Sequence, residues 1–443
     1  MTGDAHPLDP LAALGGDEAS DDAVLAAMVD VERALLRAWG ELEEVDVAAE
    51  AARLDAARLN AAALAEGNAL HGNPVIALLA GLREQVPAEG PARDLLHRGA
   101  TSQDVVDTAL VLVVARSLPS IRHDLVTAGE RLAELADRHV ATLQVGRTLT
   151  QHAAPITFGT TAAGWLDGVT SAIDGLDRLS LPVQLGGSVG TGTAIALSAE
   201  GADAPDALRT ALAAWLELDD PGRSWHTERT PILRIAAALT ATVGAAGRIG
   251  AAVSELARSE VAEVAVGSGG ASSAMPQKRN PVLPVLLVSA ARRAPGALSV
   301  IAGALVAEDQ RPAGAWHSEW PPLRELLVLA LQSAAALSQL AAGLSVDVER
   351  MRDALDSQGG AAWAEPASAL LARRDGPSAA SAAVREALAA AESDHTSHLL
   401  DRLGLSRADL ERTVFDRSSL IVDAAVARFR RVAEPGSRGE DRR

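Results

Sequence analysis

The sequence predicts an all-α fold built from long helices. Aromatic residues make up only 2% of the 443 residues. Strands favour aromatic and β-branched side chains, whereas this chain is rich in alanine, leucine, arginine and glutamate, which favour helix. Apolar residues also recur at helical spacing over long stretches. We therefore expect a core of packed helices with little sheet.

The first long helix is predicted over residues 104–142. Leu132, Leu135 and Ala136 fall on one apolar stripe of that helix and should face the core. Pro119 lies inside the helix and should cause a kink or a local break, because proline lacks a backbone N–H and clashes with the preceding turn.

Two further long helices are predicted towards the middle of the chain. The helix over 230–266 opens with Thr230 and Pro231, an N-cap followed by a proline at the first helical position. The helix over 281–306 is apolar nearly all round, which indicates burial in a bundle or in a subunit interface. A workable division is an N-terminal helical domain, a central long-helix bundle and a small C-terminal helical domain, over residues 1–105, 106–345 and 346–443.

Composition excludes several classes of protein. The formal net charge of −18 disfavours nucleic acid as a partner, although a locally positive site for an anionic substrate stays open. No cysteine is present, so neither a disulfide nor a thiolate metal site is possible. The N-terminus shows no signal peptide, and prolines and arginines interrupt the apolar stretch 282–306. We expect a cytoplasmic protein that uses no membrane.

Lys278 is the only lysine among the 40 basic residues counted as lysine or arginine. Arginine evidently serves wherever any cation is sufficient. Chance survival of one lysine and a specific role for it are about equally plausible on this count alone. A specific role would be one that a guanidinium cannot fill, such as a compact point charge on a flexible stem.

The loop from Gly267 to Pro281 is the strongest chemical signal. It combines glycines, two serine hydroxyls, one ammonium and one carboxamide before a helix start, which suits the binding of an anion. The order of residues matches neither a phosphate-binding Walker loop nor a Ser-x-x-Lys hydrolase motif. The stretch resembles the signature G-S-S-x-M-P-x-K-x-N of the fumarase/aspartase superfamily, with Ala271 in place of the signature glycine. The resemblance implies a tetramer around a twenty-helix core, with active sites shared between subunits.

A second block, residues 97–109, resembles the superfamily pattern H-x-G-x-T-S-x-D-x-x-D-T. Thr101 and Ser102 stand just before a predicted helix and could be ordinary N-caps. The resemblance implies that they also hold a substrate carboxylate, together with Gln103 and His97.

The third block, residues 146–155, points to one branch of the superfamily. Many members carry a histidine where this chain has Leu149, whereas the histidine present is His152. That arrangement is similar to the 3-carboxy-cis,cis-muconate cycloisomerase branch, which keeps G-R-T-x-x-Q-H-A-x-P. Arg98 stands where that branch often has tryptophan, so the substrate pocket could differ in detail.

The resemblance implies interconversion of 3-carboxy-cis,cis-muconate and 4-carboxymuconolactone through an aci-carboxylate intermediate. Ser273 would transfer the proton at carbon, Lys278 would stabilise the intermediate, and His152 would act as general acid or base or as a carboxylate anchor. The predicted substrate-binding residues are Thr101, Ser102, Gln103, Thr148, Gln151, Asn280, Arg311 and His97. Neither a metal nor another cofactor is expected, and the small-molecule partner is a tricarboxylate.

Two alternatives stay open on the sequence. A related lyase of the adenylosuccinate or nitrosuccinate type would eliminate a different group from a succinyl substrate and release fumarate. A catalytically dead homologue would keep the fold without the activity, but the intact Ser273, Lys278 and Asn280 count against it.

Overall fold

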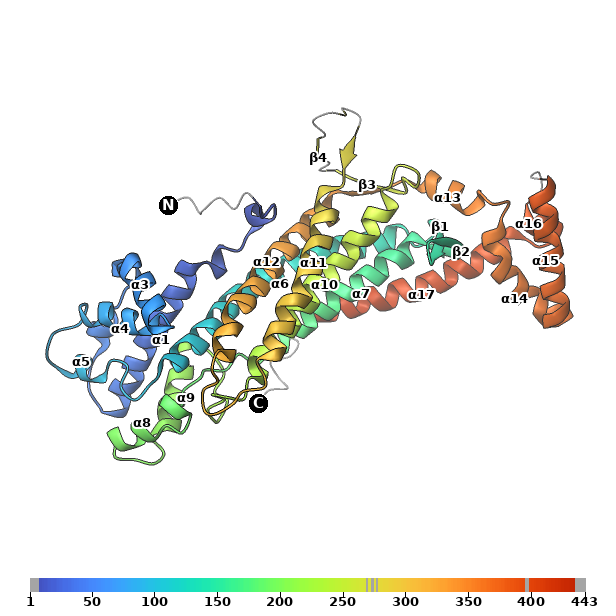
Figure 1. Cartoon of the computed structure of the whole chain (residues 1–443). Helices are drawn as coiled ribbons and strands as arrows, with labels where there is room; N and C mark the ends of the chain where they lie inside the picture. The colour runs from blue at the N-terminus through green and yellow to red at the C-terminus, as the bar shows by residue number, and fades with distance from the viewer. Residues whose placement is uncertain (1–7, 268–269, 272–274, 276–277, 395–397, 435–443) are drawn as a thin grey trace. The chain divides into compact units, whose positions relative to one another are not determined.

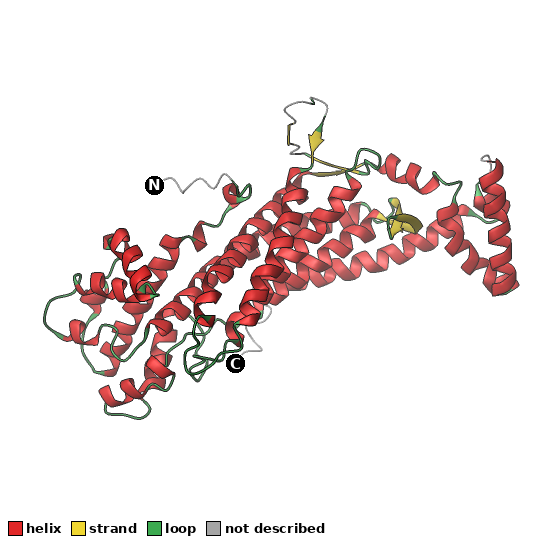
Figure 2. Cartoon of the chain, viewed as in Figure 1, coloured by secondary structure: helices red, strands yellow, loops and turns green. Residues whose placement is uncertain are grey.

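The computed structural model describes residues 8–267, 270–271, 275, 278–394 and 398–434. Helix dominates these residues, and their strands form only two-stranded sheets (Figure 2). The prediction of an all-α fold is confirmed, and the small hairpins are additions to it. The chain divides into two compact units of three segments each. Unit 1 comprises Met1–Arg122, Gly175–Val243 and Arg292–Ser333, and unit 2 comprises His123–Asp174, Gly244–Ala291 and Ala334–Arg443.

Unit 1 is organised around helix α1 (Asp21–Leu42), which packs against α9 (Ala204–Leu216) (Figure 1). The hydroxyl of Ser20 caps α1 by accepting a hydrogen bond from the third residue of the helix. Leu35 and Trp39 are fully buried on its inner face. The shorter elements of this unit are η1 (Ala12–Leu14), η2 (Asp17–Ala19), α2 (Ala48–Ala51), η3 (Ala56–Arg58), α3 (Ala61–His71), α4 (Val75–Arg83), α5 (Pro91–Leu95), η4 (Gly187–Val189) and α8 (Thr193–Ser198).

Unit 2 contains a hairpin of β1 (Leu143–Thr148) and β2 (Gln151–Thr157), on which α13 (Val348–Asp356) packs. Leu143 and Trp363 belong to the buried cluster beneath this hairpin. The other elements of the unit are β3 (Val264–Val266), β4 (Gly270–Ala271), β5 (Arg279–Asn280), β6 (Leu344–Val346), η5 (Ala361–Trp363), α14 (Ala364–Asp375), α15 (Pro377–Asp394), α16 (Leu399–Arg402) and α17 (Arg407–Ala433).

Five long helices have residues in both units, and they include the three that the sequence predicts. The predicted stripe of α6 is buried, with Leu132, Leu135 and Ala136 at most 7% exposed. Helix α6 continues through Pro119, so the local break allowed for in the prediction does not occur. The long helices are α6 (Ser102–Arg138), α7 (Phe158–Asp177), α10 (Thr230–Leu256), α11 (Val282–Gly303) and α12 (Ala315–Gly343).

Helix α10 ends ten residues earlier than the sequence pattern predicts. The chain reverses after Leu256, whose carbonyl accepts a hydrogen bond from the N–H of Glu263 at 2.9 Å. Ala262 adopts a positive φ of 50°, which a helix does not allow. Strand β3 then pairs with β6 through Val264–Val266, so the prediction of helix to residue 266 was wrong there. Apolar spacing alone does not distinguish a helix end from a short buried strand.

Three helices of the described chain, α10, α11 and α12, are long and apolar enough to cross a membrane, judged by length and composition only. The prolines and arginines in α11 were expected from the sequence to argue against a membrane span, but by length and composition α11 remains a candidate. The apolar windows of α10 and α12 are 50% and 67% buried within the chain, whereas that of α11 is only 28% buried. Val285 and Val300 of α11 are 53% and 47% exposed. Much of the apolar surface of α11 is left uncovered by the described part of a single chain.

Candidate active site

The turn before α6 brings three of the predicted substrate-binding residues together in unit 1. Arg311 donates a hydrogen bond from Nη2 to Oγ1 of Thr101 at 2.8 Å and another from Nε to Oε1 of Gln103 at 3.3 Å. Ser102 is the first residue of α6, so these groups surround a helix N-terminus. Backbone N–H groups and the helix dipole favour an anion at such an end. The arrangement suits a carboxylate.

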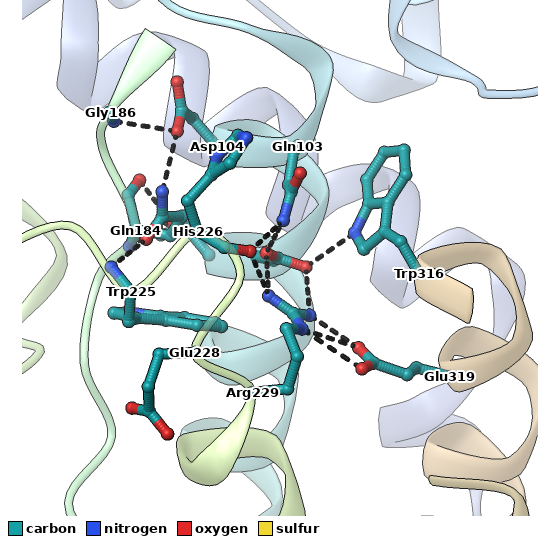
Figure 3. Close-up of polar contacts among 12 residues, drawn as sticks. Gln103, Asp104, Gln184, Gly186, Trp225, His226, Glu228, Arg229, Trp316 and Glu319 are labelled. Carbon is teal, nitrogen blue, oxygen red and sulfur yellow. Dashed lines mark hydrogen bonds and ion pairs between the residues drawn. The ribbon is translucent and has the colours of Figure 1, made fainter. Parts of the chain in front are cut away.

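Asp104 ties this turn to a glycine loop (Figure 3). Its carboxylate accepts hydrogen bonds from the N–H groups of Thr101, Gly186 and Gly187, each at 2.9 Å, and from Nε2 of Gln184 at 3.2 Å. Burial raises the pKa of Asp104 to about 7, although these four donors favour its anion. A side chain at Gly186 would lie 2.3 Å from the hydroxyl of Ser224, so only glycine fits there.

The role of Asp104 is one that sequence reasoning did not assign. The residue stands in the quoted Thr-Ser-x-Asp motif, at the third position of α6, where an acidic side chain can return to the N–H before the helix. That spacing was the available signal. The contact of Asp104 with Gly186 and Gly187, more than 80 residues later, could not be predicted from that spacing.

Arg229 forms a buried ionic hub next to the same turn (Figure 3). Its guanidinium donates to Asp107 at 2.7 and 3.0 Å and to Glu319 at 2.5 and 3.1 Å. Trp316 donates from Nε1 to Asp107 at 2.9 Å, and Gln103 donates from Nε2 to Asp107 at 3.2 Å. The three charged side chains are at most 3% exposed. This hub fixes Gln103, which in turn accepts a hydrogen bond from Arg311 and so helps to position it.

Two carboxylates share the one guanidinium of the hub. Burial raises the pKa of Glu319, Arg229 opposes that rise, and the charge of Asp107 adds to it. The pKa of Arg229 is raised: burial lowers it, but the two carboxylates outweigh burial. Neither Arg229 nor Glu319 was among the site residues predicted from the sequence.

His97 is held by a buried carboxylate from α1. Its Nδ1 lies 2.6 Å from Oε1 of Glu32. The neighbouring Arg98 points elsewhere: its Nη1 lies 3.2 Å from Glu43, and its guanidinium stacks 4.8 Å from the ring centre of Trp39. These contacts give Arg98 a packing role, so the replacement of the branch's tryptophan need not alter the substrate pocket directly.

The β1–β2 hairpin of unit 2 carries the third motif. Thr148 pairs with Gln151, and the two residues between them form the turn. Leu149 and Thr150 both have positive φ, at 48° and 69°, as this tight turn requires, although neither residue type favours it. Leu149 is 95% exposed at the tip. Thr148 and Gln151 are exposed beside it.

His152 lies on the hairpin opposite Arg147, which a buried acid anchors. Glu263, with no exposure, accepts from Nη2 and Nη1 of Arg147 at 2.5 and 3.1 Å and from Nε2 of Gln144 at 2.9 Å. Burial lowers the pKa of His152, Arg147 lowers it further, and Glu263 partly opposes. The lowered pKa favours the neutral form of the ring. It lines a cavity of about 710 Å³ together with Thr150 and Arg147.

Part of the signature loop lies outside the described residues, and Ser273 is in that part. The described part forms a small hairpin in which β4 pairs with β5. Lys278 is exposed, and its backbone N–H donates to the carbonyl of Met275 at 3.0 Å. Asn280 is half-buried and lines a cavity of about 620 Å³ distinct from that of His152.

The predicted site residues thus fall into separate groups. Unit 1 holds the Thr101–Gln103 turn, Arg311 and His97, and unit 2 holds the hairpin residues and the signature loop. Within unit 2, His152 and Asn280 line different cavities. No cluster of three or more metal-binding side chains is found among the described residues.

The sequence profile of a family described as lyase matches residues 23–296. The chain belongs to this lyase family, within the fumarase/aspartase superfamily. The matched residues contain α6, α7, α10 and the first part of α11. This match covers the Thr101 turn, the hairpin and the signature loop, but ends before Arg311 and Glu319.

Two similar proteins of the family are named for different reactions, one a lyase and the other a cycloisomerase. The chain is 46% identical over 363 residues to a nitrosuccinate lyase of Streptomyces davaonensis, covering 80% of this chain and 77% of the relative. It is 41% identical over 374 residues to a 3-carboxy-cis,cis-muconate cycloisomerase of Pseudomonas aeruginosa, covering 82% and 80%. The crystal structure of the 3-carboxy-cis,cis-muconate lactonizing enzyme of Pseudomonas putida superposes with a TM-score of 0.82 at 34% identity, covering 94% and 96% of the two chains.

Proposed function

We propose that this lyase-family enzyme is a cycloisomerase that interconverts 3-carboxy-cis,cis-muconate and 4-carboxymuconolactone. The observation that carries the proposal is the hairpin motif, which keeps the G-R-T-x-x-Q-H-A-x-P order of the cycloisomerase branch, with Leu149 in place of the histidine of many superfamily members. A carboxylate leaving group, with a pKa near that of glutamic acid (about 4), departs without a proton. A reaction that expels such a group needs no acid at Leu149.

The proposed chemistry uses groups from each motif. In the lactone-opening direction, Ser273 removes the proton next to a carboxylate, and the electrons move into that carboxylate as an aci-form. Lys278 and Asn280 stabilise the developing charge, which is the largest catalytic contribution in many enzymes. The ring C–O bond then breaks, and its electron pair leaves as the second carboxylate. Thr101, Ser102 and Arg311 bind the substrate's carboxylates. His152 anchors a further carboxylate from the hairpin, and Thr148 and Gln151 complete the pocket.

Assembly of the site from several chains is part of the proposal. A leucine that is 95% exposed on a strained two-residue turn suits insertion into another subunit. The poorly covered apolar surface of α11 needs a partner as well. A homotetramer with a shared helical core would cover both. In a cytoplasmic tetramer the apolar helices would pack against one another, so no membrane would be required.

The second candidate is a lyase that eliminates nitrite from nitrosuccinate. The 46% identity to the enzyme of that name in Streptomyces davaonensis favours it. Nitrite is also a weak base, so it too departs without an acid at the position of Leu149. The absence of an acid at the position of Leu149 therefore argues against an amine-expelling reaction, but it does not distinguish these two candidates.

One experiment with two substrates separates the candidates. Purified protein is mixed with 3-carboxymuconate while the ultraviolet absorbance of the conjugated diene is followed, and with nitrosuccinate while nitrite and fumarate are measured. We expect the diene absorbance to fall with a kcat/KM of at least roughly 10⁴ M⁻¹s⁻¹, as for ordinary enzymes. Nitrite release at a higher kcat/KM would make the second candidate correct, and turnover of neither substrate would refute both.

A further inference from the structure

Two side chains of α1 hold the turn that leads into the Thr101 site. Glu32 and Trp39 are seven residues apart and so lie on the same face of the helix. Trp39 donates from Nε1 to the carbonyl of Arg98 at 2.9 Å, and Glu32 contacts the ring of His97. Trp39 thus holds the backbone of the turn, whereas Glu32 holds a side chain of it.

Glu32 is costly as a purely structural residue. Its side chain has no exposure, and its neighbours on α1 include the buried Val31 and Leu35. Oε1 lies 2.6 Å from Nδ1 of His97, while Oε2 is buried and has no hydrogen-bond partner among the described residues. An ionised carboxylate in such surroundings is unfavourable unless it is paired, and an apolar residue would fill the same space without that cost.

His97 occupies a strained position that leaves one ring nitrogen available. Its φ of 60° is in the left-handed region, which is uncommon for a residue other than glycine. Its side chain is 15% exposed, and Nε2 is not among the buried polar atoms of the described residues that lack a hydrogen-bond partner. No hydrogen bond to Nε2 is present among the described residues. The carbonyl of His97 accepts from the N–H of Ala100 at 3.3 Å, so one tight turn separates this ring from Thr101.

We propose that Glu32 is a positioning residue that holds the Nδ1–H of His97 and keeps the ring positively charged, so that Nε2–H binds a carboxylate of the substrate beside Thr101 and Arg311. The inference rests on the proposed function only in that it requires a polycarboxylate ligand. It assigns a specific role to a buried acid of the N-terminal helix, which no motif of the sequence marks.

The charges around His97 agree with a protonated ring. Burial lowers the pKa of His97, but the charge of Glu32 and its hydrogen bond raise it, and Asp104 of α6 raises it further. Arg83 of α4 opposes these effects. The net result is a raised pKa, so the ring keeps its charge to higher pH than a free histidine does. Two of the three charged groups that act on the ring are acids.

The test is the pH dependence of tricarballylate binding by the full-length protein, measured by isothermal titration calorimetry. Tricarballylate is a tricarboxylate with no double bond, so it reports binding without turnover. Glu32→Gln retains an oxygen that can accept from Nδ1–H but removes the charge. We expect a dissociation constant roughly tenfold weaker than that of wild type at pH 7.5, the size of a lost charge-assisted hydrogen bond, and a difference that shrinks as the pH falls.

Two variants complete the design. Glu43→Gln is the matched control, because Glu43 pairs with Arg98 on the same turn but not with His97, and its binding profile should superimpose on wild type. His97→Ala should remove the part of the pH dependence that Glu32→Gln alters, and adding Glu32→Gln to it should change nothing further. Thermal unfolding of each variant verifies that the fold is retained.

Three results would overturn the inference. They are a Glu32→Gln profile that superimposes on wild type, equal weakening at every pH, and no tricarballylate binding by the wild-type protein. Failure of the proposed function looks different, since tricarballylate would then bind with the expected pH profile while neither 3-carboxymuconate nor nitrosuccinate is turned over.

Discussion

Replacing Arg229 with leucine should destabilise unit 1 severely, because it leaves two buried carboxylates without a cation. Arg229, Asp107 and Glu319 are at most 3% exposed, and the arginine makes close contacts with both acids. Removing one partner of a buried ion pair costs roughly 3–5 kcal/mol, since the remaining charge stays desolvated. Here two acids are left facing each other, so we expect the upper end of that range.

Arg209→Leu is the matched control. Arg209 is also buried, at 6% exposure, and it also bridges two acids, Asp206 and Asp220. Those acids are 66% and 26% exposed, so water can solvate them once the guanidinium is gone. We expect this variant to lose only about 1–2 kcal/mol, mainly the hydrogen bonds to charged groups.

The assay is thermal and urea unfolding of both variants between pH 5 and pH 8. A loss of about 5 kcal/mol should lower the melting temperature of Arg229→Leu by roughly 10–20 °C at pH 8. Without Arg229 the pKa of Glu319, already raised by burial and by Asp107, rises further. An acid with a raised folded-state pKa binds its proton more tightly when folded, so the deficit of the variant should shrink as pH falls. Equal losses for Arg229→Leu and Arg209→Leu, or a deficit that grows towards pH 5, would refute this reasoning.

Three further predictions concern the motifs. Lys278→Arg should lower kcat/KM at least about a hundredfold, or 2.7 kcal/mol, because the compact ammonium is lost although the charge is kept; near-normal turnover would show that the lysine is not special. Leu149→His should not accelerate the reaction, and a tenfold gain in kcat/KM would mean that leaving-group protonation is limiting and that an amine-expelling lyase is the better assignment. Asp104→Asn should cost about 1–3 kcal/mol in urea unfolding, because Gly186 and Gly187 donate to different carboxylate oxygens and the amide NH₂ that replaces one of these oxygens cannot accept. Burial raises the pKa of Asp104 from 3.8 to about 7, so the free energy of unfolding of the wild-type protein should fall as the pH rises through that window. The variant should lose this pH dependence, and an unchanged dependence would contradict the prediction.

Much of the fold could be predicted because long amphipathic helices leave a regular pattern. The buried stripe at Leu132 and Leu135 follows directly from spacing. The end of α10 could not be predicted, since it depends on the positive φ of Ala262 and on the pairing of β3 with β6 some 80 residues later. The hairpin around Leu149 could not be predicted either, because Leu149 and Thr150 are not residue types that favour a two-residue turn.

The candidate site was predictable only where a motif is contiguous. The Thr101 turn and the signature loop each lie within one short stretch. Arg311 was predicted to bind a substrate carboxylate, but its contact with Thr101 was not predicted. The Glu32–His97 pair joins residues 65 positions apart, and Glu263 reaches Arg147 over 116 positions. A lone buried acid on an apolar helix face gives no local signal of its partner. Such residues become visible only when the tertiary structure is known.

The sharing of active sites between chains is tested most directly by mixing two inactive variants. Ser273→Ala removes the proton-transferring group of the signature loop, and His152→Ala removes the hairpin histidine. After the two proteins are dissociated, mixed and reassembled, hybrid oligomers verified by native mass spectrometry should recover a measurable fraction of wild-type kcat, because some sites then receive the intact serine from one chain and the intact histidine from another. Verified hybrids that are no more active than either parent would contradict a site built from different chains.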